Sequence, residues 1–249
     1  MRMDLSRELG PPPHLSAMLA GGPASLFLDF DGTMVELAPG PNDIKPRADL
    51  TDRLTELSVK IGHRCAIVSG RSLADIERHI GSLPVAGAGS HGSDIRMADG
   101  QAIGKGAEGL PAEIEQALRS FASDNALDYE HKPHGGALHY RKSPDKGPIA
   151  HEFAEALAAE HGWAAQSGKC VVELVSREAN KGAAVFAFMR EAPFAGSRPF
   201  FIGDDLTDEA GFEACAQLGG AGIIVGERQN TLARYRLSDV TTVHQWLEF

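Results

Sequence analysis

Asp29 and Asp31 stand one residue apart where the apolar run of residues 25–28 ends. If that run is a buried strand, side chains two residues apart point to the same side, so both carboxylates face one site. Two like charges this close are costly unless a cation or a shared proton relieves them, and Mg2+ prefers oxygen ligands. The alternative is a plain β-turn, because Asp-Gly at 31–32 is a common turn signal.

Three more polar segments come directly after an apolar run or at the start of a helical pattern. They are Ser69-Gly70-Arg71 after the run 65–68, Asn180-Lys181-Gly182, and the acidic segment 203–209 (GDDLTDE) after the run 199–202. Open α/β sheets bind ligands at the carboxyl ends of their strands. The sequence therefore predicts that these segments gather with Asp29 at one edge of a sheet.

In this order, the four segments resemble the four motifs of the haloacid dehalogenase (HAD) superfamily of phosphotransferases. The segments 86–92 (AGAGSHG), 138–141 (LHYR), 168–173 (GKCVVE) and 246–248 (WLE) extend the resemblance to the trehalose-6-phosphate phosphatases within it. That resemblance implies a Rossmann-like α/β core with a parallel sheet and an inserted, smaller α/β cap domain. It also implies Mg2+ dependence and hydrolysis of trehalose 6-phosphate through an aspartyl-phosphate, the final step of trehalose biosynthesis.

Four residues are the predicted catalytic groups. Asp29 is the nucleophile, because carboxylates form aspartyl-phosphates, and Asp31 is the general acid and then the base that activates water. Ser69 combines a hydroxyl with backbone N–H groups at a helix start, which suits a phosphate. Lys181 lies in the first turn of a predicted helix, where the macrodipole disfavours a cation, so we expect it to neutralise Asp29 and the phosphate.

The acidic residues divide into metal ligands and residues that fit a helix start. The predicted Mg2+ ligands are Asp29, Asp31 and Asp204. Asp205 is either an outer ligand or the N-cap of the following helix, and both interpretations stay open. Asp208 and Glu209 complement the dipole of that helix, and no chemistry is assigned to them.

Five residues are candidates for substrate binding. The resemblance implies that Lys169 and Glu173 contact sugar hydroxyls. On a strand these two share a face and lie about 13 Å apart at ~3.3 Å per residue, a span that suits a disaccharide. His91 and Lys132 are weaker candidates. Arg71 either holds the substrate phosphate or pairs with a carboxylate, and the sequence favours neither.

The order of the predicted elements explains how these residues are brought together. Strands at 24–29, 64–68, 84–88, 199–202 and 221–225 alternate with helices at 47–61, 72–80, 181–190 and 205–218. In between, helices 111–124 and 148–161 accompany strands 127–132, 137–141, 163–166 and 169–175, which read as antiparallel pairs. We expect a core domain of 23–96 and 177–249, a cap domain of 97–176, and a poorly ordered lead-in of 1–22.

Composition narrows the class of partner. The formal net charge is −10 and Lys and Arg form no run, which argues against nucleic acid or an anionic membrane. No apolar stretch approaches the roughly 20 residues of a membrane span, and the first 23 residues contain no signal-peptide core. Three separated cysteines indicate reduced thiols in a cytoplasmic protein. The expected partner is a small sugar phosphate, and the oligomeric state is left open.

Two alternative functions remain. A related phosphatase that acts on sucrose phosphate or a mannosyl phosphate would carry the same core motifs, and only the cap would differ. A catalytically silent sensor of phosphosugars would have lost Asp29, Asp31 or Lys181, and all three are present.

Overall fold

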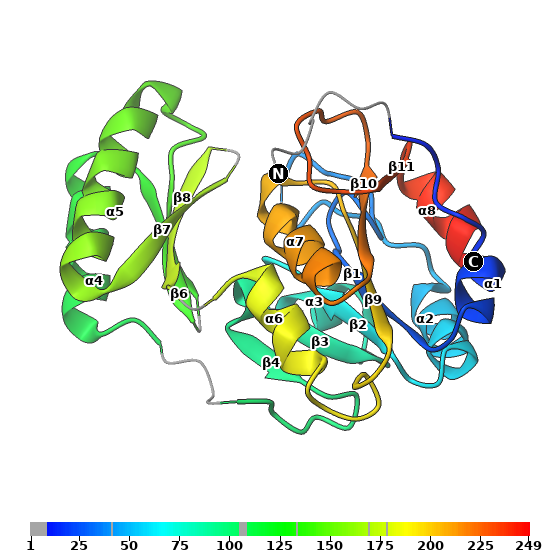
Figure 1. Cartoon of the computed structure of the whole chain (residues 1–249). Coiled ribbons are helices and arrows are strands. Elements are labelled where there is room, and N and C mark those ends of the chain that lie inside the picture. The colour runs from blue at the N-terminus through cyan, green and yellow to red at the C-terminus, as the bar shows by residue number, and fades with distance from the viewer. Residues whose placement is uncertain (1–8, 41, 105–108, 133, 169, 178) are drawn as a thin grey trace. The chain divides into compact units, whose positions relative to one another are not determined.

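The computed structural model describes residues 9–40, 42–104, 109–132, 134–168, 170–177 and 179–249. The chain separates into two compact units, one formed by Met1–Gly104 with Asn180–Phe249 and the other by Lys105–Ala179. The second unit is inserted in the sequence between the two parts of the first, in the region where an insert at 97–176 was expected. Each unit contains its own sheet (Figure 1).

The first unit is built on a seven-stranded sheet with the order β11-β10-β9-β1-β2-β3-β4. All neighbouring strands are parallel except β4, which runs antiparallel to β3. The strands are β1 (Ala24–Leu28), β2 (Cys65–Val68), β3 (Ala86–Gly89), β4 (Asp94–Arg96), β9 (Arg198–Gly203), β10 (Ala221–Val225) and β11 (Tyr235–Leu237).

Helices cover both faces of this sheet. They are α1 (Leu15–Ala20), α2 (Leu50–Lys60), α3 (Leu73–Ile80), α6 (Lys181–Phe188), α7 (Glu209–Gln217) and α8 (Val240–Leu247). Leu26 and Leu28 of β1 join a buried cluster with residues of α1, α2, α3 and α8, while Phe27 joins a second cluster with residues of α6 and α7. Because alternate side chains of β1 enter different clusters, the strand is buried throughout and apolar except at Ser25, as is typical of parallel strands covered on both faces.

The second unit is a four-stranded antiparallel sheet with the order β5-β6-β8-β7. Its elements are α4 (Ala112–Asp124), β5 (Asp128–Lys132), β6 (Gly135–His139), α5 (Gly147–His161), β7 (Trp163–Gly168) and β8 (Val171–Ser176). Leu138, Val172 and Leu174 pack with apolar residues of α4 and α5 in a cluster of their own. One face of this sheet is therefore covered by two helices (Figure 1).

The first residues differ from the expectation of a poorly ordered lead-in. Residues 9–22 of that segment are described, and they contain α1, whose Leu15 is fully buried. The indole N–H of Trp246 also donates a hydrogen bond to the carbonyl of Pro13. Three prolines and a six-residue helix give little periodic signal, but the apolar pair Leu15 and Met18 docks the segment on the core. Residues 1–8 lie outside the described range.

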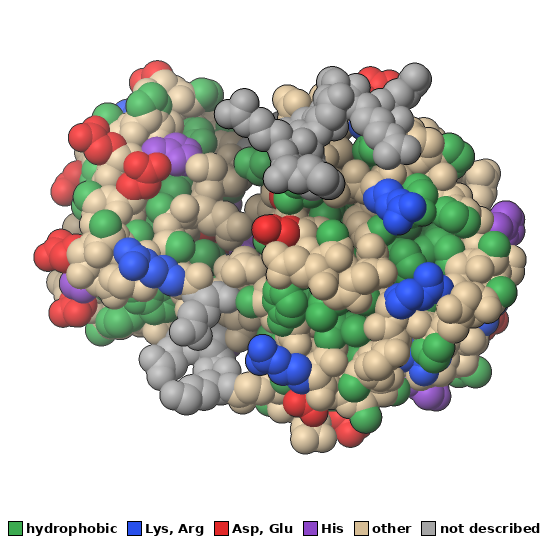
Figure 2. Space-filling view, in the orientation of Figure 1, with side chains coloured by type: hydrophobic (Ala, Val, Ile, Leu, Met, Phe, Trp, Pro, Cys, Tyr) green, Lys and Arg blue, Asp and Glu red, His purple; other side chains and the backbone are tan. Residues whose placement is uncertain are grey.

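The described Lys and Arg side chains do not gather into a patch on the face that is drawn. Figure 2 shows Lys and Arg side chains scattered among acidic and apolar ones, without one basic patch among the side chains described on that face. In the described parts of the chain, no helix is both long and apolar enough to cross a membrane.

Candidate active site

The parallel strands place the predicted motifs at one edge of the sheet. β1 lies between β2 and β9 in parallel register, and Asp29, Ser69 and Asp204 each follow the last residue of one of these strands. The Asp29 N–H donates to the carbonyl of Ile202, which ties the end of β1 to β9. The predicted gathering of these segments at the carboxyl edge is present in the fold.

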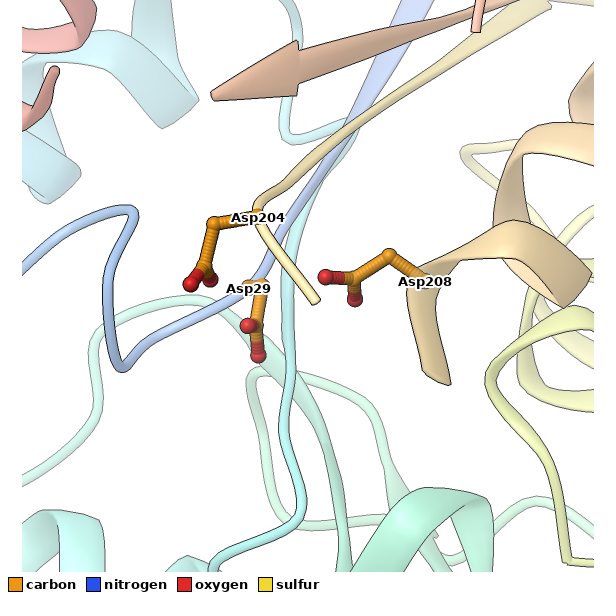
Figure 3. Close-up of side chains that lie close together, drawn as sticks. All are labelled: Asp29, Asp204 and Asp208. Atoms are coloured by element: carbon orange, nitrogen blue, oxygen red, sulfur yellow. The ribbon is translucent and has the colours of Figure 1, made fainter. Parts of the chain in front are cut away.

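Three carboxylates converge at this edge. One oxygen each from Asp29, Asp204 and Asp208 lies within 4.8 Å of the others, and Figure 3 shows the three side chains directed toward one another. Asp29 is 4% exposed and Asp208 is fully buried. The sequence grouped Asp29 and Asp204 with Asp31 instead, whereas in the structure the third carboxylate of the cluster is Asp208.

Lys181 supplies the cation that this cluster contains. Its ammonium Nζ lies 2.8 Å from Asp29 Oδ1 and 2.6 Å from Asp208 Oδ1, and the side chain is 3% exposed. The helix start that places it is fixed by Asn180, whose side chain accepts a hydrogen bond from the Ala183 N–H. The local conflict with the helix dipole is thus offset by two carboxylate partners.

Burial and mutual repulsion set the protonation of this cluster. Burial, followed by the charge of Asp208, raises the pKa of Asp29 well above its usual value. The same two causes raise the pKa of Asp204 to about 7. Burial opposes the charge of Lys181, but Asp208 and Asp29 outweigh it and raise its pKa. Three carboxylates against one ammonium leave an excess of negative charge, which fits a hard divalent cation.

Two glycines allow the carboxylates to come this close. A Cβ on Gly32, which has φ +75°, would lie 2.2 Å from Asp204 Oδ2, and one on Gly203 would lie 2.3 Å from Asp208 Cγ. Either clash would push a carboxylate out of the cluster. The glycines that follow Asp31 and precede Asp204 are therefore part of the site.

Asp208 is the residue that the sequence reasoning missed. The predicted helix 205–218 is interrupted, because residues Leu206–Asp208 form a 3-10 turn before α7 begins. Asp205 caps this turn by accepting from the Leu206 N–H, while Asp208 Oδ2 accepts from the Asp205 N–H. This favours the N-cap interpretation of Asp205. The available signal was the spacing of four residues between Asp204 and Asp208, one turn of a helix.

Arg71 is paired with carboxylates. Its guanidinium donates to Asp31 at 2.6 and 2.8 Å and to Asp75 at 2.7 Å. Ser69, which is 1% exposed, accepts a hydrogen bond from the Arg71 N–H through its hydroxyl. Of the two roles left open for Arg71, the structure contains the pairing, and Asp31 is held beside the 69–71 loop instead of in the three-carboxylate cluster.

The remaining candidates for substrate binding lie in both units. His91 packs against the 69–71 loop, since a Cβ on Gly70 would lie 2.6 Å from its ring. Its backbone and that of Ser90 are left-handed, with φ of 58° and 48°, a conformation that is often found at functional sites. In the second unit, Lys132 Nζ lies 2.5 Å from Glu173 Oε1. Lys169 falls outside the described residues.

The fold is similar to solved phosphatase structures. A phosphatase of the HAD superfamily from Bacteroides thetaiotaomicron aligns with a TM-score of 0.64 and 16% identity, over 95% of this chain and 96% of its own. The C-terminal domain of trehalose-6-phosphate phosphatase from C. albicans aligns with a TM-score of 0.78 and 20% identity, over 98% and 99%. The parallel sheet with its antiparallel insert therefore has the fold of the HAD phosphatases.

Sequence comparison identifies the family within that fold. The family model described as trehalose-phosphatase matches residues 27–241. The chain is 34% identical to "Trehalose-6-phosphate phosphatase" from Escherichia coli (strain K12), over 98% of this chain and 91% of the relative. It is 40% identical to "Probable trehalose-phosphate phosphatase" from Sinorhizobium fredii, over 81% and 77%. The chain belongs to the trehalose-phosphatase family.

Proposed function

We propose that this protein hydrolyses trehalose 6-phosphate to trehalose and phosphate, and that Mg2+ is required. The observation that carries the proposal is the buried contact between Lys181 and Asp29, beside two further carboxylates, at the carboxyl edge of the sheet. Membership of the trehalose-phosphatase family supports the substrate.

The proposed reaction gives each of the two aspartates of the first motif its own role. The carboxylate of Asp29 attacks phosphorus, an Asp29–phosphorus bond forms, and the bond from phosphorus to the sugar oxygen breaks. Asp31 gives a proton to the departing oxygen, then takes one from the water that cleaves the acyl phosphate and frees Asp29. Because Asp31 is held by Arg71, it has to exchange or share this partner before it donates a proton.

The charge of the transferring group is balanced by residues of the same edge. Lys181 neutralises Asp29 and the incoming phosphate, and the Ser69 hydroxyl binds a phosphoryl oxygen. Asp29 and Asp204 would hold the Mg2+, with Asp31 as the predicted third ligand and Asp208 as a further carboxylate nearby. When bound, the ion would neutralise charge that develops on the transferring oxygens.

The three cysteines support the proposed cytoplasmic location. Cys65, Cys170 and Cys215 are free thiols, and two of them are buried. Unpaired thiols are typical of a reducing compartment.

The substrate assignment is tested by a phosphate-release screen over a panel that contains trehalose 6-phosphate, sucrose phosphate and mannosyl phosphates, with Mg2+ present. We expect trehalose 6-phosphate to have the highest kcat/KM. A higher value for one of the others would replace the proposed substrate, and no release from any of them would favour the sensor.

Removal of divalent cations should abolish turnover, and Mg2+ should restore it. Mg2+ should also raise the Tm of the wild type, because it relieves repulsion among the three carboxylates. The pKa of Asp204 is raised to about 7, and the ion binds the ionised carboxylate. The Mg2+ concentration needed for half of the rise in Tm should therefore increase as the pH falls below 7. Calorimetric melting with and without Mg2+ measures this apart from activity.

The matched variants for the metal are Asp204→Asn and Asp239→Asn. Asp239 caps α8 by accepting from the Thr242 N–H, which Asn also does, so this control should keep the Mg2+-induced rise in Tm. Asp204→Asn should lose that rise. Full activity after exhaustive chelation would contradict the proposal.

Glu173→Ala should distinguish binding of the sugar from the reaction at the phosphoryl group. A lost hydrogen bond to a sugar hydroxyl costs about 1–3 kcal/mol, or roughly 5- to 150-fold in kcat/KM for trehalose 6-phosphate. A small aryl phosphate, which has no sugar to bind, should be hydrolysed nearly as before. Binding to remote parts of a substrate can support orientation, so kcat as well as KM should change.

Glu152→Ala is the control for this comparison, because Glu152 is an exposed residue of α5. It should leave both substrates unchanged. An equal loss for both substrates in Glu173→Ala would assign Glu173 to the catalytic step or to the fold.

A further inference from the structure

Gln166 lies next to Glu173 on the sheet of the second unit. The two residues are directly paired between β7 and β8, and Ala137 of β6 is paired with Glu173 on the other side. Cross-strand partners carry their side chains on the same face. Leu138, Val172 and Leu174, which alternate with these residues, pack against α4 and α5. Gln166 and Glu173 therefore share the face that the helices do not cover.

The amide oxygen of Gln166 has no hydrogen-bond partner among the described residues, whereas the charged groups beside it are paired. On the same face, Glu173 pairs with Lys132, and the carboxylate of Glu130 accepts a hydrogen bond from His139 Nε2 at 2.8 Å. Gln166 Oε1 is buried and has no partner among the described residues. A buried polar atom left in this state is costly, so it calls for an explanation such as a ligand.

We propose that Gln166 is a specificity-determining residue, which hydrogen-bonds a sugar hydroxyl adjacent to the one that Glu173 contacts. This inference rests on the proposed function, because it takes the substrate to be a sugar phosphate. In-register partners have Cβ atoms about 4.5–5.5 Å apart, so two neighbouring hydroxyls of one ring lie within reach of both side chains.

The chemistry of the amide suits this position. A second carboxylate directly opposite Glu173 would repel it, whereas a neutral amide adds an acceptor without charge. The amide also carries donors, so either orientation of the group matches a hydroxyl, which both donates and accepts. The contact is thus selective for a hydroxylated ligand and indifferent to the phosphoryl group.

The test compares Gln166→Leu with Gln116→Leu, an exposed glutamine of α4 that serves as the control. Gln166→Leu should lower kcat/KM by about 5- to 50-fold for the best sugar phosphate of the panel, with a change under about twofold for an aryl phosphate. Its Tm should equal or exceed that of the wild type, because an apolar group replaces an unsatisfied one. Gln116→Leu should match the wild type throughout.

Each other result contradicts the inference. If both substrates lose equally or the Tm falls, Gln166 supports the fold, and if neither substrate changes, it does not contact the sugar. The proposed function fails separately, if the wild type prefers a sugar phosphate other than trehalose 6-phosphate. Gln166→Leu and wild type are then compared on the preferred sugar phosphate. If the wild type turns over none, calorimetric binding of trehalose 6-phosphate to wild type and Gln166→Leu decides, and equal affinity overturns the inference.

Discussion

Asp29→Asn should abolish turnover while the protein stays folded. The substitution keeps the shape of the side chain, but an amide cannot form the acyl phosphate, so kcat should fall by roughly 10^4-fold or more. The loss should be equal for trehalose 6-phosphate and an aryl phosphate, since both pass through the same phosphorylated residue. Steady-state phosphate release from the purified variant measures the effect, and circular dichroism checks the fold.

A direct observation of the intermediate complements this variant. Wild type quenched with acid during turnover should carry a phosphoryl group on the peptide that contains Asp29. The Asp31→Asn variant should bind the substrate largely as before, but its turnover should be strongly reduced. Asp239→Asn is again the matched control, because it changes a capping carboxylate outside the carboxylate cluster. Substantial turnover by Asp29→Asn would exclude Asp29 as the nucleophile.

The strands that carry the site could be predicted because their signals are local. The apolar run before Asp29 ends where β1 ends, and the run 199–202 ends one residue before the end of β9. The expected strand 24–29 is observed as Ala24–Leu28. The expected helix 72–80 is observed as α3, which Ser72 caps by accepting a hydrogen bond from the Asp75 N–H. The carboxyl ends of parallel strands lie at the same edge of a sheet, so the strand order alone predicts that separate motifs meet there.

The parts that could not be predicted depend on contacts between distant residues. Asp208 enters the carboxylate cluster only because a 3-10 turn breaks the helix and because Gly203 has no side chain. Arg71, for which the sequence left phosphate and carboxylate open, pairs in this structure with Asp31 and Asp75. The spacing of four residues fits the pair with Asp75, but nothing in the position of Asp31 along the chain specifies its approach to Arg71.

Lys181→Ala should damage both stability and catalysis. Removing one partner of a buried ion pair leaves uncompensated charge, here on Asp29 and Asp208, at a cost of about 3–5 kcal/mol of unfolding free energy. Turnover should fall by roughly 10^2-fold or more, because the charge of the incoming phosphate then meets two unscreened carboxylates. Lys60→Ala is the control, since Lys60 pairs with Glu248 at an exposed position where ion pairs contribute little.

The pH dependence of this defect distinguishes lost charge compensation from lost packing. Lys181 lowers the pKa of Asp29, which burial and Asp208 raise, so its removal moves that pKa higher still. A carboxyl whose pKa is raised on folding lowers the stability progressively as the pH rises above its unfolded pKa, and the loss is complete above its folded pKa. The defect in urea unfolding without metal should therefore be largest at pH 8 and shrink toward pH 5. Mg2+ should restore part of the stability at pH 8, because a bound cation replaces the missing ammonium. A defect that is constant with pH and insensitive to Mg2+ would show that Lys181 acts through packing alone.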